Sequence, residues 1–468
     1  MTIIDNVNIN AIFRRGHTPD RNAVLDILAR ARELKGVGRE EALTLLSVSD
    51  EDLLQELFET ARWIKGEIYG NRLVLFAPLY ISNLCENDCA YCAFRKANTG
   101  LVRRALSQDE IARETAALMA QGQKRLLLVA GESYNEDGLD YVFKSIDTIY
   151  SVKSDKGNIR RINVNIAPLS VEEFKRLREH NIGTYQLFQE TYHEPTYRRL
   201  HPRGPKADYR YRLESMDRAF EAGLGDVGIG VLFGLYDWRY EILALLSHIE
   251  HLENKFGVGP HTISIPRLEP AFGAPLSYTP PHAVSDDDFK KIIAVLRIAV
   301  PYTGIILSTR ENAAMRREAF ELGVSQISAG SRTNPGGYSL GEEPVEPGAA
   351  ANDCQFSLGD TRSMREVVLD IVQHGHIPSF CTACYRLGRV GKDFMDLAKP
   401  GLIKHNCLPN AILTFAEYLG DFADEKLRSK GFAMIERMID SDLQNENLRK
   451  RVRENLAQIR GGKRDIYV

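Results

Sequence analysis

One sequence feature most constrains what this chain can fold into. Short runs of residues favoured in β-strands alternate with amphipathic segments that begin with polar residues. Runs of this kind, rich in β-branched and apolar residues, predict buried strands. Eight of them occur, at 73–82, 125–131, 162–168, 184–191, 227–234, 261–269, 304–310 and 325–331. Eight strands alternating with helices predict an α/β fold with a parallel sheet that closes into a (β/α)8 TIM barrel. An open, doubly wound sheet is the competing topology.

Helix-start signals separate these runs. Ser107 with Glu110 and Ser170 with Glu173 match the capping box, in which two side chains satisfy backbone donors reciprocally. The glycines of 223–228 spell G-x-G-x-x-G, but a predicted helix precedes them and a strand follows. A dinucleotide site has the reverse order, so this match indicates a helix cap and a turn.

The chain divides into three predicted parts. Apolar spacing in residues 1–70 predicts an N-terminal helical extension. Residues 71–377 would form the barrel, with a Gly/Pro-rich connection near its end. Residues 378–468 would form a mostly helical C-terminal domain that carries a second group of cysteines. The 468 residues accommodate one barrel, which uses about 250 residues, together with both flanking parts.

The composition excludes several classes of protein. A net charge of -3 provides no bulk positive field for nucleic acid or an anionic membrane. The sequence contains neither an 18-residue apolar run nor a secretory signal, so we expect a cytoplasmic protein that binds no nucleic acid and no membrane. Six of the seven cysteines form two groups of three, and reduced, clustered thiols are typically metal ligands. Cys354 stands alone, and we expect it to be a buried apolar residue without a role.

The first cysteine group directly follows the first predicted strand. Cys85, Cys89 and Cys92 form a C-x3-C-x2-C pattern. A structural zinc site would need a fourth ligand, whereas a 4Fe-4S cluster held by three cysteines leaves one iron open to a small chelating molecule. The loop after a barrel strand lies at the C-terminal face, where barrel enzymes have their active sites. A zinc site and chance clustering are the alternatives.

This motif, in this place, resembles the radical S-adenosylmethionine (SAM) superfamily. The resemblance implies that the open iron chelates SAM and that reduction yields a 5'-deoxyadenosyl radical. It also implies SAM contacts from Tyr91 at the adenine, Gly131 and Glu132 at the methionine ammonium, Glu190 at the ribose and Arg212 at the carboxylate. Structural salt bridges are the alternative for Glu190 and Arg212.

The second cysteine group lies in the predicted C-terminal domain. Cys381 and Cys384 are separated by two residues, and Cys407 follows 22 residues later. Three cysteines again suit a 4Fe-4S cluster with an open iron. A zinc site completed by His405 or His376 is the alternative.

Nearly the whole chain resembles the HydG family, the radical SAM tyrosine lyases of [FeFe]-hydrogenase maturation. The resemblance rests on CENDCAYC, LFQETYH, HTISIPRLEPA, LSTRE, SAGSRTNPGGY and CTACYR with its distant cysteine. It implies cleavage of L-tyrosine at Cα–Cβ to p-cresol and dehydroglycine. Carbon monoxide and cyanide would then form an Fe(CO)2(CN) synthon at an auxiliary 4Fe-4S cluster, with L-cysteine as a further ligand there. Implied partners are a ferredoxin- or flavodoxin-type electron donor, a maturation scaffold GTPase and a sister radical SAM maturase.

Two other functions remain open. ThiH, the lyase that supplies dehydroglycine for thiamine thiazole synthesis, is similar in LSTRE and PGGY but lacks the second cysteine group. A non-catalytic iron–sulfur carrier or scaffold would need neither a SAM pocket nor a barrel. The HydG resemblance further implies that His261 binds a labile fifth iron. Because His261 begins a strand, it would lie at the bottom of the barrel, so the auxiliary cluster would have to cap that end.

The tyrosine carboxylate needs a cation at the catalytic face. Candidate tyrosine contacts at the ends of the last two strands are Ser308, Arg310, Ser331 and Arg332. Arg310 is the first choice because it belongs to the segment shared with ThiH. A rim salt bridge with Glu311 or Glu269 is the alternative.

Overall fold

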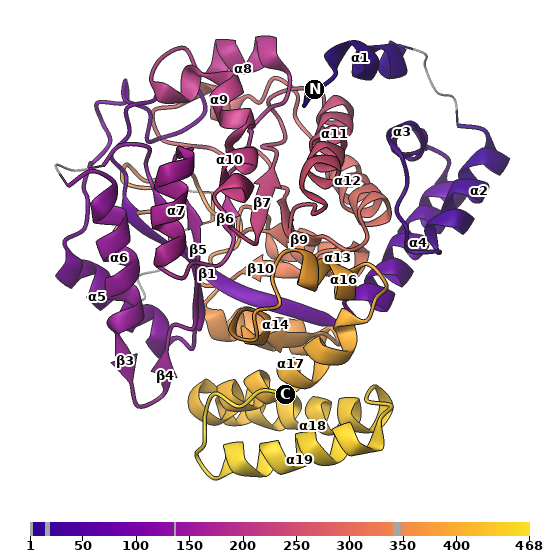
Figure 1. The fold of residues 1–468 in the computed structure, drawn as a ribbon, viewed down its shortest axis with the longest axis vertical. Helices are drawn as coiled ribbons and strands as arrows, with labels where there is room; N and C mark the ends of the chain where they lie inside the picture. The colour runs from indigo at the N-terminus through magenta and orange to yellow at the C-terminus, as the bar shows by residue number, and fades with distance from the viewer. Residues whose placement is uncertain (1–2, 15–18, 135–136, 340–346, 349) are drawn as a thin grey trace.

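A closed, parallel eight-stranded barrel forms the centre of the computed structural model, which describes residues 3–14, 19–134, 137–339, 347–348 and 350–468. The barrel strands are β1 (Arg72–Ser82), β2 (Arg125–Ala130), β5 (Arg161–Asn165), β6 (Tyr185–Gln186), β7 (Val227–Gly230), β8 (Thr262–Ser264), β9 (Gly304–Leu307) and β10 (Gln326–Ser328). β10 pairs in parallel with β1, with Leu75 opposite Ile327. This pairing closes the sheet, confirms the predicted barrel and excludes the open topology (Figure 1).

Helices surround the barrel as predicted (Figure 1). They are α5 (Gln108–Ala120), α6 (Leu139–Ser151), α7 (Val171–Glu179), α8 (Glu194–Leu200), α9 (Tyr209–Leu213), α10 (Ser215–Glu221), α11 (Trp238–Phe256), α12 (Asp286–Ala299), α13 (Ala313–Leu322) and α14 (Met364–Gln373). Both capping boxes are present, since Ser107 and Ser170 accept from the backbone N–H of Glu110 and Glu173. Gly223 follows α10 with a φ of 82°, so the glycine-rich match is a turn after a helix.

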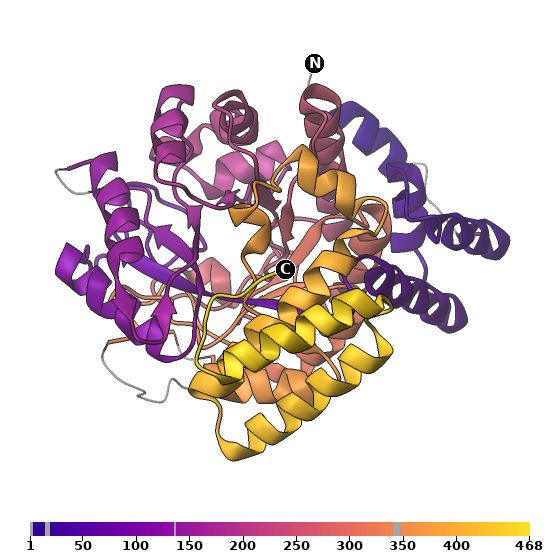
Figure 2. The ribbon, with the colours of Figure 1, turned by 60° about the horizontal axis from the view of Figure 1, so that its bottom comes forward.

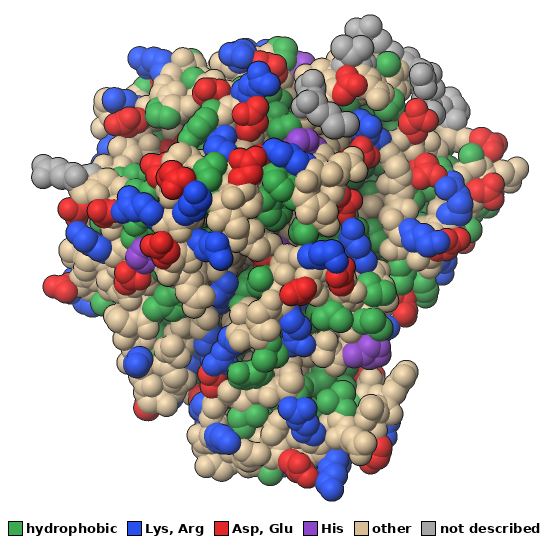
Figure 3. Space-filling view, viewed as in Figure 1, with side chains coloured by type: hydrophobic (Ala, Val, Ile, Leu, Met, Phe, Trp, Pro, Cys, Tyr) green, Lys and Arg blue, Asp and Glu red, His purple; other side chains and the backbone are tan. Residues whose placement is uncertain are grey.

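The N-terminal residues fold into four helices. These are α1 (Asn6–Arg14), α2 (Arg21–Ala31), α3 (Arg39–Leu46) and α4 (Glu51–Ile68). They pack along α11, α12 and α13 on the outside of the barrel. Within the described residues, no helix has the length and apolar character that crossing a membrane requires. On the face shown in Figure 3, basic and acidic side chains are interspersed.

The C-terminal region contains α15 (Ala383–Arg386), α16 (Lys392–Ala398), α17 (Ile403–Phe422), α18 (Glu425–Ser441) and α19 (Glu446–Arg460). In Figure 2 the last three of these helices lie together across one end of the barrel. A ninth strand, β11 (Ile377–Ser379), connects this region to the barrel by pairing with the start of β1, where Ile377 lies opposite Arg72. The sequence did not predict this strand, nor the hairpin of β3 (Lys153–Ser154) and β4 (Gly157–Asn158). The domain boundary at 377/378 remains a proposal.

Candidate active site and a second cysteine site

The larger cavity, of about 180 Å³, lies at the C-terminal ends of the barrel strands. Cys85, Cys89 and Cys92 all line it, because the loop after β1 turns back over the barrel mouth. Gly131 allows this close return: a Cβ there would collide with the carbonyl oxygen of Leu84. The structure therefore gives Gly131 a packing role in addition to its predicted contact with SAM.

Burial dominates the chemistry of the three thiols. It raises the pKa of Cys85, Cys89 and Cys92, that of Cys92 to about 11. Because the thiolate is the form that binds metal, loading a cluster here releases protons. Three sulfur donors facing one cavity fit a three-cysteine 4Fe-4S cluster with an open iron.

A buried ionic network forms the polar wall of this cavity. Arg212 Nη1 donates to Glu132 Oε1 at 2.8 Å, and Lys206 Nζ donates to Glu190 Oε1 at 2.6 Å. Arg212 Nη2 also lies 3.6 Å from Glu190, so the two pairs are joined. Asn87 Nδ2 donates to the second oxygen of Glu132 at 2.8 Å. Glu190 and Arg212 thus form salt bridges and also line the cavity, so the structure fits both interpretations of these residues.

The charges in this network offset one another. Burial alone would raise the pKa of Glu132 and Glu190, but Arg212 and Lys206 outweigh it and hold both carboxyl pKa values below their usual range. Both acids are therefore ionised and available to cationic or hydroxyl groups of a ligand. Sequence reasoning missed Lys206, which lies in a short 3-10 turn (Pro205–Ala207) without a recognisable motif.

Glu190 has a strained backbone. Its φ is 70°, in the left-handed region that a side chain with a Cβ rarely adopts. Strain of this kind costs about 1–3 kcal/mol and clusters at functional sites. Glu190 lies four residues beyond β6, and its carboxylate lines the cavity beside Lys206.

Tyr91 lines the same cavity from the cysteine loop. Its hydroxyl and His201 Nε2 lie 2.8 Å apart, and the two rings meet edge to face. Lys206 Nζ lies 5.9 Å from the Tyr91 ring centroid. The ring is thus fixed at the cavity wall, where a flat heterocycle could pack against it.

The candidate tyrosine contacts divide into two groups. Ser308 and Arg310 line the cavity, whereas Ser331 and Arg332 are not among its lining residues. Among the described residues, no ion pair joins Arg310 to Glu311 or Glu269. Glu311 instead pairs with a different arginine, Arg267. The rim salt bridge of Arg310 with Glu311 is therefore wrong, whereas Glu269 is close enough to Arg310 for the arginine charge to oppose the burial that raises the pKa of Glu269 to about 7.

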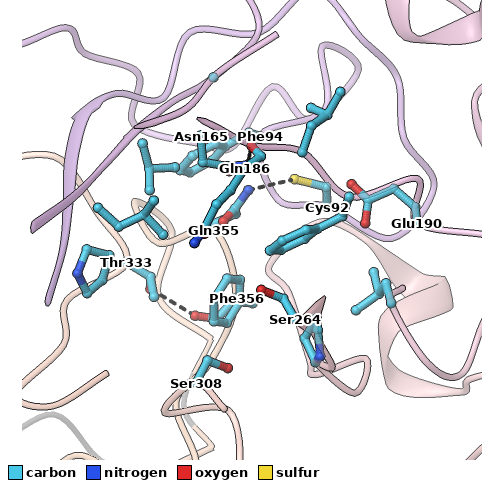
Figure 4. Close-up of a pocket in the computed structure, with 18 of the residues that line it drawn as sticks. Cys92, Phe94, Asn165, Gln186, Glu190, Ser264, Ser308, Thr333, Gln355 and Phe356 are labelled. Carbon is cyan, nitrogen blue, oxygen red and sulfur yellow. Dashed lines mark hydrogen bonds between the residues drawn. The ribbon is translucent and has the colours of Figure 1, made fainter. Parts of the chain in front are cut away.

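Residues beyond the last barrel strand complete the cavity. Gln355 and Phe356 line it, and in Figure 4 Gln355 contacts Cys92, with its Nε2 donating to Cys92 Sγ at 3.9 Å. Gln355 Oε1 accepts from the Tyr80 hydroxyl at 2.7 Å, and the Arg310 guanidinium lies over the Phe356 ring, 3.3 Å from its centroid. Sequence reasoning missed both residues, because they come from an irregular segment that carries no periodic signal.

The second cavity, of about 50 Å³, lies at the opposite end of the barrel. Cys381, Cys384, Cys407 and His261 all line it. Its other walls include residues at the N-terminal ends of strands, among them Arg72, Arg125 and Gly304. The structure therefore brings together, at the bottom of the barrel, the second cysteine group and the histidine singled out with it.

Inward-facing side chains of β1 connect the two cavities. Arg72 and Val74 line the lower cavity, and Phe76, Pro78 and Tyr80 line the upper one. Alternate residues of a strand point to the same side, so these five positions form one continuous inner face. The two cavities are stacked along the barrel interior.

His261 is buried and neutral. Burial lowers its pKa, and its Nδ1 lies 3.6 Å from Asp226 Oδ1. A carboxylate beside one ring nitrogen is the usual arrangement around a metal-binding histidine. The thiols of Cys384 and Cys407 share a hydrogen bond that raises the pKa of Cys384 and lowers that of Cys407.

The zinc alternative for the second group finds no support in the position of its histidines. His376 and His405 are not among the residues that line the second cavity, and His376 Nε2 contacts Glu321 at 2.9 Å. Among the described residues, no group of three or more His, Cys, Asp or Glu is placed so that it could hold a single metal ion, and this holds for both cysteine groups, so it does not separate zinc from an iron–sulfur cluster. Cys354 is half-buried beside Asp353 and lines neither cavity.

Comparisons with known proteins agree with this geometry. Residues 79–246 match the radical SAM superfamily, and residues 264–377 match the biotin and thiamin synthesis associated domain. The 2-iminoacetate synthase of Escherichia coli (strain K12) is 31% identical over 78% of this chain and 92% of its own length. A crystal structure of HydG, a maturase of the [FeFe]-hydrogenase, is 49% identical, with a TM-score of 0.95 over the full length of both chains. The maturase HydG from Carboxydothermus hydrogenoformans is 42% identical, with a TM-score of 0.82 over 96% of this chain and 98% of its own.

Proposed function

Because this chain belongs to the HydG family of radical SAM enzymes, we propose that it cleaves L-tyrosine and converts part of it to carbon monoxide and cyanide. The observation that carries the proposal is the pair of cavities stacked in one barrel, each lined by three cysteines. Tyrosine would be cleaved at Cα–Cβ in the upper cavity, giving p-cresol and dehydroglycine. The smaller product would react in the lower cavity.

The upper cavity would bind SAM. A 4Fe-4S cluster held by the first cysteine group would supply the electron that cleaves SAM to a 5'-deoxyadenosyl radical. Glu132 would accept from the methionine ammonium, and Glu190 from the ribose hydroxyls. Arg212, buried between these two acids, would hold the SAM carboxylate while neutralising both. Closed walls exclude water from the radical.

Arg310 would bind the tyrosine carboxylate. It lies three residues beyond β9 and is half-buried; its guanidinium packs over the Phe356 ring and donates to the carbonyl oxygen of Arg267 at 3.5 Å. A partly desolvated guanidinium without an ion pair is unfavourable, and a bidentate carboxylate would relieve that cost. Ser308 would add a hydrogen bond. Ser331 and Arg332 remain weaker proposals because they do not line the cavity.

The lower cavity would hold the auxiliary 4Fe-4S cluster on Cys381, Cys384 and Cys407. His261 would bind the labile fifth iron, with L-cysteine as a further ligand. Dehydroglycine, HN=CH–COO⁻, contains the same atoms and charge as CO, CN⁻ and water together. Its breakdown to these products therefore needs no added oxidant. Because each dehydroglycine supplies one CO and one CN⁻, an Fe(CO)2(CN) synthon for hydrogenase maturation would draw on two tyrosines and leave one cyanide free.

The proposed partners follow from this role. A ferredoxin- or flavodoxin-type donor would reduce the cluster, and the synthon would pass to a scaffold GTPase that works with a sister radical SAM maturase. We propose that the enzyme acts in the cytoplasm. A lyase that only supplies dehydroglycine, as in thiazole synthesis, is the second candidate, since the 2-iminoacetate synthase is similar over most of this chain. The second cysteine cavity favours the first candidate.

Product analysis tests the proposal. The protein is reconstituted anaerobically with iron and sulfide, reduced, and supplied with SAM and L-tyrosine. We expect p-cresol together with carbon monoxide and cyanide. Absence of p-cresol would refute both lyase functions, and p-cresol without either diatomic product would favour the second candidate.

A further inference from the structure

Three arginine side chains line the lower cavity without a carboxylate partner. Arg72 and Arg125 are the first residues of β1 and β2, and Arg389 follows α15. The Nε atoms of all three, and Nη2 of Arg389, are buried and have no hydrogen-bond partner. Among the described residues, none of these guanidinium groups forms an ion pair. A buried cation without an anion is strongly unfavourable, so the cavity is built for an anionic occupant.

The one carboxylate in the cavity wall, that of Asp226, forms no ion pair with these arginines, and its Oδ2 is buried without a hydrogen-bond partner among the described residues. Asp226 Oδ1 accepts from the backbone N–H of Gly391 at 2.9 Å and faces His261 Nδ1 at 3.6 Å. By contrast, Arg161, the corresponding first residue of β5, does not line the cavity. Its Nε is likewise buried without a partner, but Nη1 and Nη2 donate to the carbonyl oxygens of Asn181 and Ile182, whereas no described residue accepts a hydrogen bond from the guanidinium groups of Arg72, Arg125 and Arg389.

Two of the three arginines approach the cavity from a different part of the chain than the cysteines, whereas Arg389 belongs to the same C-terminal segment as the cysteines. The N-terminal ends of β1 and β2, at the bottom of the barrel, carry Arg72 and Arg125, and His261 immediately precedes β8 at the same end. All three cysteines come from residues 381–407 of the C-terminal region. An anion held by Arg72 and Arg125 would therefore lie between the cysteines and the barrel interior, on the side from which a small molecule made in the upper cavity would arrive.

We propose that Arg72, Arg125 and Arg389 form a carboxylate-binding subsite that holds the carboxylate of the two-carbon imine released from tyrosine. This inference rests on the proposed function, which makes that imine in the upper cavity. Guanidinium groups match carboxylates in a planar, bidentate geometry. The three arginines would act as positioning residues that orient the imine toward the cysteines and His261. They would also prevent the imine from escaping to solvent.

The test measures binding of glyoxylate, the stable carbonyl analogue of the imine, to full-length reconstituted protein. A Cys89→Ala background removes the first cluster, so that the electron paramagnetic resonance signal reports on the auxiliary cluster alone. We expect glyoxylate to shift that signal with a saturable affinity, and glyoxylamide, its neutral analogue, to bind at least tenfold more weakly. Arg72→Met should weaken glyoxylate binding by about 10- to 100-fold. Arg210→Met is the control and should change it little, because this exposed arginine pairs with Glu214 at 2.9 Å and does not line the cavity.

Specific outcomes would overturn the subsite. Equal binding of glyoxylate and glyoxylamide would show that the arginines only neutralise the negative charge of the cluster and do not bind a carboxylate. An unchanged glyoxylate affinity in Arg72→Met would also refute it. If Arg72→Met fails to load its cluster, the comparison of the two ligands on the parent protein decides. Failure of the proposed function is read separately, as absence of p-cresol from the wild-type enzyme.

Discussion

Replacing Glu132 by Gln removes one charge from the SAM pocket while keeping the shape of the side chain. The change is informative because both carboxylate oxygens are engaged. Oε1 accepts from Arg212 Nη1 at 2.8 Å and Oε2 from Asn87 Nδ2 at 2.8 Å. In our account the same carboxylate also receives the ammonium of SAM, an interaction that a neutral amide cannot match.

The magnitude follows from the kind of bond that is lost. A hydrogen bond to a charged group contributes about 1.5–3 kcal/mol, and about 1.4 kcal/mol corresponds to a tenfold change in affinity. The Glu132→Gln variant should therefore bind SAM roughly 10- to 100-fold more weakly. Glu194→Gln is the control, because that acid pairs with Arg198 at 2.6 Å on the outer surface of α8. Exposed pairs of this kind contribute little, and the affinity for SAM should not change.

Isothermal titration of SAM into anaerobically reconstituted protein measures both variants. Iron and sulfide content establish first that each variant carries its clusters. A dissociation constant within twofold of wild type for Glu132→Gln would refute the assignment of Glu132 to the ammonium. Equal weakening in Glu194→Gln would show that the effect is not local to the pocket.

Two further predictions concern stability. Asp360→Asn should lower the free energy of unfolding by about 3 kcal/mol, because it removes the anion that lies 3.0 Å from the fully buried Arg316. Denaturant titration measures this loss of stability. A loss below about 1 kcal/mol would contradict the prediction. Burial lowers the pKa of Lys65 to about 7, so between pH 7 and 10 the unfolded chain binds more protons and the folded state gains stability as pH rises. The stability difference between wild type and Lys65→Met should therefore change over this range, and parallel pH profiles would refute the prediction.

Most of the fold was predictable because barrel strands and their helices leave local signals. Each strand is a short apolar run, and the capping boxes at Ser107 and Ser170 mark where helices begin. The strand β11 was missed because three residues, one of them Pro378, give no periodic pattern. The role of β11 is apparent only in the tertiary structure, where its pairing with the start of β1 brings Cys381 close to that strand.

The site was predictable where its residues share a motif. The first cysteine group and Glu132 follow strands directly, so their position in the barrel fixes which end they occupy. Lys206 and Gln355 were missed because each lies in irregular backbone and reaches the cavity only through the fold. Arg72 and Arg125 begin regular strands, but their role was missed because they lie far apart in sequence and meet only at the lower cavity.

The central claim is that two reactions occur at the two ends of one barrel. The most direct measurement compares the products of Cys384→Ala with those of wild type and Cys89→Ala, each shown to be folded. Our account predicts that Cys384→Ala still releases p-cresol from tyrosine but yields no carbon monoxide, whereas Cys89→Ala yields neither. Wild-type output of carbon monoxide from Cys384→Ala would contradict the claim.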